Sequence, residues 1–387
     1  MNDFVNIEID NKLNDCGQSP IIKCLTYSND DFSTFKKILN NNEEKAKRVI
    51  KLREILYKNN LKNDEILLAC QLLGRLISAK FSGKSQSMDA IELTLLKIVN
   101  GFKNSSKLIF TICFGGYKNY HSPSFPEVDF AELWNLNYMV TYLYPLIKHY
   151  PHGVTLEYES EEISIQFNNV EQKTTDKYTK SFQKLIKWYV KEAKNKYNLE
   201  LDIKFTLARS LYESDEALYE LMKGNKETYI QHFASLGNEE REKWIQRADS
   251  NFMVDGIIDY SNVDDDEKYE LLKNARINNE SFLDADYVLR EKWFNEDNRI
   301  PLTGTWGLMP SASPIDGWLH IKSTSSSRTD FWIGTGVLEK RLKEFSEVIL
   351  SVSNYEDVKD KIAFVEVTNT DLIKVSTNFK KITIITN

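Results

Sequence analysis

The stretch Lys107–Asn119, KLIFTICFGGYKN, decides the fold of this chain. It predicts a buried strand at 108–113, which ends at Gly115 and Gly116 and leads through a polar, aromatic loop into a helix. Open α/β sheets build binding sites from a strand, a glycine turn and a helix in this order, because glycine turns sharply and leaves backbone N–H groups free for an anion. The stretch therefore predicts an anion-binding turn at the end of a central strand.

The rest of the chain extends this pattern. Apolar residues recur at three- and four-residue spacing in the first hundred residues, and strands return in the last hundred. We predict an α/β fold with a Rossmann-like open sheet. A helical N-terminal region spans 1–104, and one α/β core spans 105–387 with a helical insertion at about 213–297.

Apolar periodicity and turn residues predict the individual elements. Helices are expected at 30–39, 43–57, 64–79, 88–99, 130–149 and 176–197. Strands are expected at 154–158 and 163–167, which form a hairpin, at 199–208, at 317–323 and 331–339, which a Ser/Thr-rich turn joins, and at 362–367 and 381–386.

Composition and charge limit the class of protein. A chain of 387 residues with 41% hydrophobic and 28% charged residues has the composition of a soluble globular protein. The net charge of −7, from 57 acidic and 50 basic residues, argues against binding to nucleic-acid backbones. The acidic N-terminus lacks a secretory signal, and no uninterrupted apolar run of about 18 residues follows. We expect a cytoplasmic protein that binds neither nucleic acid nor a membrane.

The GxGxxG, GxxxxGK[ST] and GxSxG fingerprints are absent, so a site must be inferred from individual residues. Lys118 follows the paired glycines, which distinguishes it from an ordinary surface lysine. Its ammonium would meet a phosphate or carboxylate there, or act as an amine nucleophile. Gly115, Gly116, Tyr117 and Asn119 complete the predicted substrate-binding turn.

A second stretch, 299–341, concentrates unusual residues: three of the seven tryptophans, five glycines and one of only five histidines. Aromatic rings among glycine turns either wall a pocket for a planar ligand or fill the core behind a hairpin. His320 falls on a predicted short strand and is the leading candidate for an acid/base histidine. The candidate binding side chains of this stretch are Arg299, Trp306, Trp318, Arg328 and Trp332.

No metal site is predicted. His121 with Glu127, Asp129 and Glu132 offers ligand atoms but lacks the HxxxH or HExxH spacing that places two ligands on one helical face. Asp129 and Glu132 have the spacing of a capping box at a helix start, which explains them without a metal. Cys113, inside the predicted strand, is expected to be a buried thiol.

Taken in order, these features resemble the isocyanide (isonitrile) synthases of the pyoverdine and dityrosine biosynthesis group. The resemblance covers about a third of the chain. Near the C-terminus, Trp318 and His320 are similar to a Trp-His pair of that family, but Leu319 separates them. The main matching positions are Gly116, Lys118, Asn119 and Pro123, then Asp129 to Glu132 with Leu133, then Tyr150, Pro151 and Gly153 before VTLEYES.

The resemblance implies an enzyme that condenses the α-amine of an amino acid, often tyrosine or tryptophan, with the ketone of ribulose 5-phosphate. The sugar's C2 becomes the isonitrile carbon. Lys118 and the glycine N–H groups would hold the phosphate, Arg299 or Arg328 would neutralise a phosphate or carboxylate, and His320 would move protons. The tryptophans would face the amino-acid side chain. This scheme needs no cofactor, and its partners are the two small-molecule substrates and an oxygenase downstream in the pathway.

Two other functions are compatible with the sequence. In the first, a nucleotide- or phosphosugar-dependent transferase or ligase binds phosphate at the glycine turn, and Asp129 or Glu132 holds magnesium. In the second, a non-catalytic protein binds a partner through the charged helical faces of 213–296.

Overall fold

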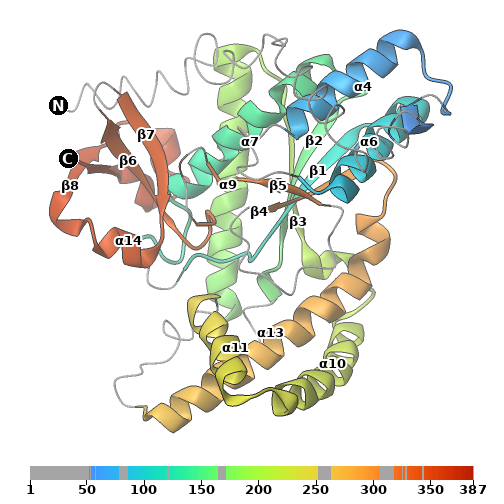
Figure 1. Ribbon diagram of the computed structural model, residues 1–387. Helices are drawn as coiled ribbons and strands as arrows, with labels where there is room; N and C mark the ends of the chain where they lie inside the picture. Colours follow the sequence, from blue (N-terminus) through green and yellow to red (C-terminus); the bar gives the residue numbers. More distant parts are fainter. Residues whose placement is uncertain are drawn as a thin grey trace.

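A five-stranded parallel sheet, a helical arm and a four-stranded C-terminal sheet make up most of the described part of the chain (Figure 1). The helices predicted at 30–39 and, for the most part, 43–57 lie outside it. The computed structural model describes residues 52, 54–56, 58–77, 86–119, 122–163, 171–251, 263–304, 318–324, 326, 329–341 and 344–386.

The central sheet has the strand order β3-β2-β1-β4-β5, and every neighbouring pair is parallel. The chain moves outward from β1 to β3 on one side and from β4 to β5 on the other, so the order reverses between β1 and β4. Rossmann-type sheets bind ligands beyond the carboxyl ends of the strands at such a reversal. The predicted α/β class with an open sheet is confirmed. The strands are β1 (Leu108–Phe114), β2 (Val154–Ser160), β3 (Asp202–Leu207), β4 (Arg299–Gly304) and β5 (Leu319–Ile321).

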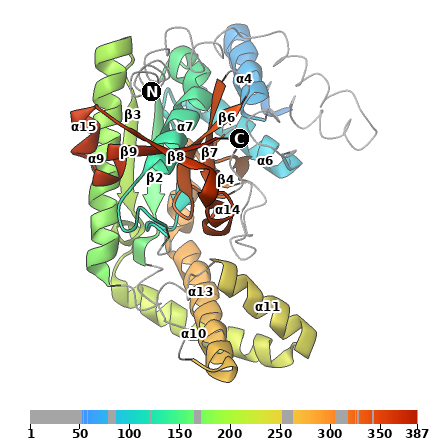
Figure 2. The ribbon, with the colours of Figure 1, turned by 90° about the vertical axis from the view of Figure 1, so that its left-hand side faces the viewer.

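Helices pack on this sheet and extend beyond it. The helices α7 and α9 connect β1 to β2 and β2 to β3 and contact each other, while α6 contacts β1, β4 and β5. The helices α10, α11 and α13 form an arm beyond the carboxyl ends of the strands (Figures 1 and 2). The bounds are α4 (Asn63–Leu76), α6 (Met88–Lys103), α7 (Phe130–His149), α9 (Gln172–Tyr197), α10 (Asp215–Ser235), α11 (Asn238–Asn251) and α13 (Asp265–Phe294).

The two faces of β1 and β2 differ in polarity, because successive side chains of a strand point to opposite faces. On one face, Phe114 and Tyr158 pack against Phe182 of α9, with ring centroids 5.5 and 5.1 Å away. This aromatic face belongs to the core. The opposite face carries polar side chains in matching register: Thr111 beside Glu157, and Cys113 beside Glu159.

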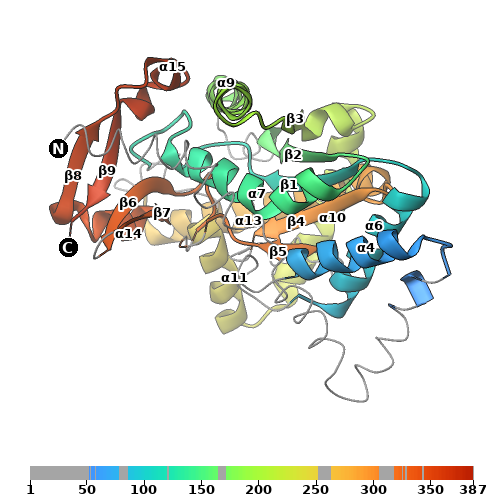
Figure 3. The same ribbon diagram turned by 90° about the horizontal axis from the view of Figure 1, so that it is seen from above.

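The C-terminal sheet has the order β7-β6-β9-β8, with β6 and β9 parallel and the outer pairs antiparallel. It packs against α7 through β6 and β7 (Figure 3). The last part of the chain therefore contributes β4 and β5 to the central sheet and then builds a second sheet. The strands are β6 (Thr335–Arg341), β7 (Glu344–Leu350), β8 (Ile362–Glu366) and β9 (Lys381–Ile385), with short helices α14 (Val352–Glu356) and α15 (Thr370–Ile373).

Two predicted strand pairings are wrong. The 154–158 strand is not part of a hairpin, because β2 is hydrogen-bonded in parallel to β1 on one side and β3 on the other. Its predicted partner at 163–167 lies, apart from Ile163, outside the described residues. The 317–323 and 331–339 segments do not pair either, since β5 joins β4 in the central sheet and β6 joins the C-terminal sheet. In both cases short sequence separation predicted a contact that non-local pairing overrode. The strand at 344–350 was not predicted at all.

The contact between the C-terminal sheet and α7 gives a prediction about the stability of the protein. A Cβ added at Gly336 of β6 would lie 2.2 Å from the backbone N of Ala131 at the start of α7, so the sheet and the helix would have to separate. We expect Gly336→Ala to lower the free energy of unfolding by about 1–3 kcal/mol or more. Gly224→Ala is the matched control, because its Cβ meets nothing within 4 Å. Urea unfolding measures both; equal stability of the two variants would contradict this packing.

Candidate functional site

The glycine turn lies at the carboxyl end of β1, beside the reversal of strand order. Gly116 has a φ of +71°, and a Cβ on it would lie 2.2 Å from Ser160 Oγ and 2.7 Å from the backbone N of Glu162. A Cβ on Gly115 would lie 3.0 Å from Trp332 Nε1. Both glycines are therefore needed here, since the chain after β2 and the Trp332 ring approach the turn closely.

Lys118 follows this turn and is buried, with only 1% of its surface exposed. Its Nζ lies 3.1 Å from Asp129 Oδ1, 3.0 Å from Glu132 Oε1 and 3.2 Å from the carbonyl oxygen of Phe331. Three acceptors match the three N–H donors of an ammonium. Phosphate binding by Lys118 stays a prediction; in the structure this ammonium ties the glycine turn to α7 and to the segment before β6.

The helix α7 begins with the capping box that the sequence predicts. The Asp129 carboxylate accepts a hydrogen bond of 2.6 Å from the Ala131 N–H, and Glu132 Oε2 accepts one of 2.8 Å from the Asp129 N–H. Glu132 also accepts a hydrogen bond of 3.1 Å from the Tyr178 hydroxyl. Complete burial raises the pKa of Glu132 to about 8, against the opposing effect of Lys118. Both carboxylates are thus engaged within the protein.

Tyr117, Asn119 and Trp332 surround the same turn. The Asn119 N–H donates a hydrogen bond of 2.9 Å to the Trp332 carbonyl, and the Trp332 ring lies 5.8 Å from that of Phe114. Burial, together with the charges of Asp330 and Glu161, raises the pKa of the Tyr117 hydroxyl. The predicted turn residues therefore lie together at the end of β1. His121, Trp306 and Arg328 lie outside the described residues.

Arg299 lies away from this turn, at the start of β4. Its guanidinium donates to Thr111 Oγ1 at 2.7 Å and to Glu296 Oε2 at 2.9 Å, contacts Glu157, and stacks 3.9 Å from the Trp293 ring. The backbone of Arg299 is level with Ile109, about 13 Å before the Cys113 level at a strand rise of about 3.3 Å. Substrate binding by Arg299 stays a prediction.

His320 and Trp318 are also separated from the turn. His320 lies on β5, two strands from β1, which is about 10 Å at the usual strand spacing. Its backbone N–H and carbonyl both hydrogen-bond the Gln86 side chain at 2.8 Å. The Trp318 ring packs 4.8 Å from that of Phe294 at the end of α13. The acid/base role of His320 stays a prediction.

A buried group of charged residues occupies the carboxyl ends of β1 and β2, and the sequence analysis missed it. Arg290 of α13 forms ion pairs with Glu159, with Glu161 at 2.8 Å and with Asp286. The Tyr212 hydroxyl donates a hydrogen bond to Asp286. These contacts hold the helical arm against the carboxyl ends of β1 and β2. We call the following residues the Arg290 cluster: Cys113, Glu159, Glu161, Glu162, Tyr212, Asp286 and Arg290.

One local signal pointed to this cluster. Glutamates alternate at 157, 159 and 161. The first two lie on one face of β2, which is paired on both sides, and the third directly follows the strand. Strands of a parallel sheet are normally apolar on both faces, so such alternation marks a polar site. No local pattern identifies Arg290, because it lies 129 residues beyond Glu161 on a charged helix.

Burial sets the protonation of the cluster. It raises the pKa of Glu159 to about 8 and that of Glu162 to about 7, and Arg290 opposes the shift in both cases. The pKa of Glu161 is raised by burial too, and that of the Cys113 thiol lies well above its usual range. Carboxyl groups that exchange protons near neutral pH are suited to acid–base chemistry.

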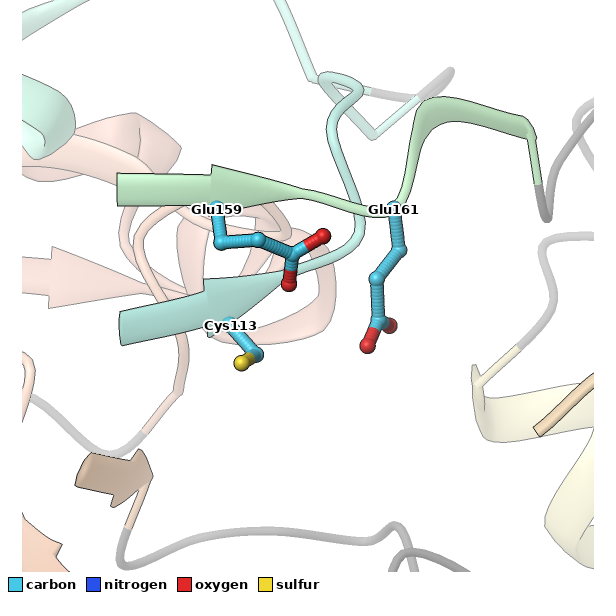
Figure 4. A group of neighbouring side chains, drawn as sticks. All are labelled: Cys113, Glu159 and Glu161. Atoms are coloured by element: carbon cyan, nitrogen blue, oxygen red, sulfur yellow. The ribbon is translucent and has the colours of Figure 1, made fainter. Parts of the chain in front are cut away.

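Three side chains of the cluster have ligand atoms close together. The potential ligand atoms of Cys113, Glu159 and Glu161 all lie within 4.8 Å of one another, and the side chains point to the same side of the two strands (Figure 4). A metal would need the Cys113 thiolate, which burial disfavours. Arg290 already contacts both carboxylates. The guanidinium therefore supplies the positive charge that a metal ion would bring to these carboxylates.

Comparison with known proteins supports the fold. No protein-family profile matches the chain, and no curated protein matches it either. The structure is similar to that of the PvcA protein from Pseudomonas aeruginosa, with a TM-score of 0.50 and 13% identity over 88% of this chain and 99% of that chain. The two chains share a fold. At the level of the fold, this confirms the resemblance to isonitrile synthases that the sequence indicates. None of the helices in the described ranges is long and apolar enough to span a membrane.

Removing the central cation tests the energetics of the cluster. We expect Arg290→Met to lower the free energy of unfolding by about 3–5 kcal/mol at neutral pH, because it leaves buried carboxylates without a partner. Lys243→Met is the control, since Lys243 forms an exposed ion pair with Glu239 and its loss costs no more than about 1 kcal/mol. Urea unfolding gives both values. An Arg290→Met protein as stable as the control would show that the buried pairs contribute nothing.

The raised pKa values predict how stability depends on pH. The folded chain holds protons on Glu159 and Glu162 that the unfolded chain releases near the ordinary value of 4.5. This stabilisation is complete below about pH 4.5 and is lost as the pH rises through 7 to 8. The melting temperature should therefore fall between pH 5 and pH 8.5. Glu162→Gln should flatten the part of this fall that lies between pH 5 and pH 7, whereas the exposed Glu366→Gln should leave it unchanged.

Proposed function

We propose that this protein is a biosynthetic enzyme of the isonitrile synthase type that acts on an amino acid. The observation that carries the proposal is the Arg290 cluster, in which buried carboxyl groups with raised pKa values surround one guanidinium at the carboxyl ends of β1 and β2. In Rossmann-type sheets this edge is where ligands bind. Similarity to PvcA along 88% of the chain supports the same enzyme class.

The carboxyl ends of β1 and β2 and the carboxyl end of β5 suit different parts of the two substrates. Over β1 and β2 the buried groups are mainly carboxylates, which attract an amine. Lys322 directly follows β5, on the other side of β4, and forms no ion pair with the described residues. We propose that the amine of the amino acid lies over β1 and β2 and that the phosphate of ribulose 5-phosphate lies toward β5, near His320. This orientation brings the amine and the ketone together between the two ends.

The alternatives have weaker support. A nucleotide-dependent transferase would place phosphates at the glycine turn, but the Lys118 ammonium that would bind them is already paired with Asp129 and Glu132. Glu162, whose backbone packs on Gly116, adds a carboxylate that repels phosphate. Asp129 and Glu132, the predicted magnesium ligands, contact Lys118 instead. A purely non-catalytic role for the helical arm does not explain why the arm supplies Arg290 to a buried site on the sheet.

A direct assay tests the proposed reaction. The purified protein is incubated with ribulose 5-phosphate and each proteinogenic amino acid, and products are identified by mass spectrometry. We expect a new isonitrile product with at least one amino acid, with aromatic ones tested first because Phe114 and Trp332 border the turn. Absence of a new product from every pair would refute the proposed reaction.

His320 has a matched control in the arm. If His320 transfers protons during turnover, His320→Ala should lower kcat by about 10²–10⁴-fold. His232→Ala removes an exposed histidine of α10 and should leave kcat unchanged. Equal rates for the two variants would exclude His320 from the chemistry.

A further inference from the structure

Glu162 carries a buried carboxylate oxygen that has no hydrogen-bond partner among the described residues. The residue lies two positions after the end of β2, is 6% exposed, and its Oε2 is the atom without a partner. A buried oxygen without a hydrogen-bond partner lowers the stability of the folded protein, so its presence points to a function. Its carboxylate lies close enough to Arg290 for the two charges to interact, so it belongs to the interior of the cluster.

Carboxylates outnumber cations around this oxygen. The cluster has four of them and a single guanidinium, and that guanidinium already contacts three. Arg209 also faces Glu162, but it forms an ion pair of 3.3 Å with Asp215. When these carboxyl groups are ionised, the excess charge is negative, and the ligand that would balance it is a cation. The four carboxylates belong to Glu159, Glu161, Glu162 and Asp286.

Aromatic residues border the carboxylates. The hydroxyl of Tyr117 is close enough to Glu161 for the two to interact electrostatically, and Gly116 packs directly on the backbone of Glu162. The Trp332 ring lies at the same turn, because a Cβ on Gly115 would lie 3.0 Å from its Nε1. Carboxylates and aromatic rings together favour an ammonium group attached to an aromatic side chain.

We propose that the Arg290 cluster binds the ammonium group of an aromatic primary amine, with Glu162 as its principal acceptor. The charge of Arg290 is shared among three of the protein's own carboxylates, so this end of the site favours the amine over the carboxylate of an amino acid. An amine without a carboxyl group is therefore a ligand too. The inference deepens the proposed function and rests on it for its biological meaning, but its test needs no turnover.

Binding of an ammonium should be linked to proton release. The groups that act on Glu162 are Ser160 at the end of β2, Arg290 from α13, and Arg209 and Tyr212 from the segment after β3. Arg290 in turn contacts Glu159, Glu161 and Asp286. Because burial raises the pKa of Glu162 to about 7, the empty site holds a proton that an ammonium displaces. The affinity for an amine should therefore rise from pH 6 to pH 8.

Two probes that differ in one group test the proposal. Tyramine carries an ammonium where tyrosol carries a hydroxyl, and both are titrated into the wild-type protein by calorimetry at pH 6, 7 and 8 at constant ionic strength. We expect tyramine to bind at least about tenfold more tightly than tyrosol at pH 8, with an affinity that increases with pH. Equal affinities, or no binding of tyramine, would overturn the proposal.

Variants then identify the acceptor. Glu162→Gln keeps the shape of the side chain and should weaken tyramine binding by about tenfold without changing tyrosol binding. Glu162→Asp keeps the charge and should bind tyramine with intermediate affinity, and the exposed Glu366→Gln should bind like wild type. Wild-type affinity in Glu162→Gln would overturn the role of Glu162. Tyramine binding without any isonitrile product would retain this inference and refute only the proposed reaction.

Discussion

The ion pairs between Arg290 and the carboxylates at the end of β2 are the constraint on which the rest of the site depends. Arg290 belongs to the helical arm, whereas its partner Glu159 belongs to β2 and its partner Glu161 directly follows that strand. Burial disfavours the charge of the guanidinium, but the two glutamates outweigh this effect and raise its pKa. The cation is therefore permanent, and it fixes the arm against the carboxyl ends of the strands.

A second buried cation, Lys118, organises the neighbouring side of the same strand end. It connects the glycine turn to Asp129 and Glu132 of α7 and to the carbonyl of Phe331. Arg290 and Lys118 thus hold four separate parts of the chain around the end of β1: the arm, the turn, the start of α7 and the segment before β6. Such pairs contribute little net stability compared with apolar packing, but each excludes arrangements that would leave a charge unpaired.

The sequence predicts local features of this fold well and long-range ones poorly. The strand and glycine turn at 108–116, the helix at 130–149 and its capping box follow from spacing alone, and the structure has them. The hairpin at 154–167 and the pairing of 317–323 with 331–339 are wrong, because parallel partners come from distant segments that no local pattern specifies. The same limit applies to the candidate site. The sequence predicts that the turn residues lie together. It does not predict the contact of Arg290 with its partners, because this contact depends on the packing of α13 near the end of β2.

The alternation of glutamates along β2 has a consequence for how the chain chooses its register. A slip of one residue would turn Glu157 and Glu159 into the aromatic face beside Phe182 and move Tyr158 toward Arg290. Both charges would then be buried among rings, far from any guanidinium, so the slipped sheet would be strongly disfavoured. β2 has a strand on each side and few turns that fix its position. The alternating glutamates therefore help to determine its register. The glutamates that bind buried guanidinium groups in this sheet therefore also favour a single register of β2.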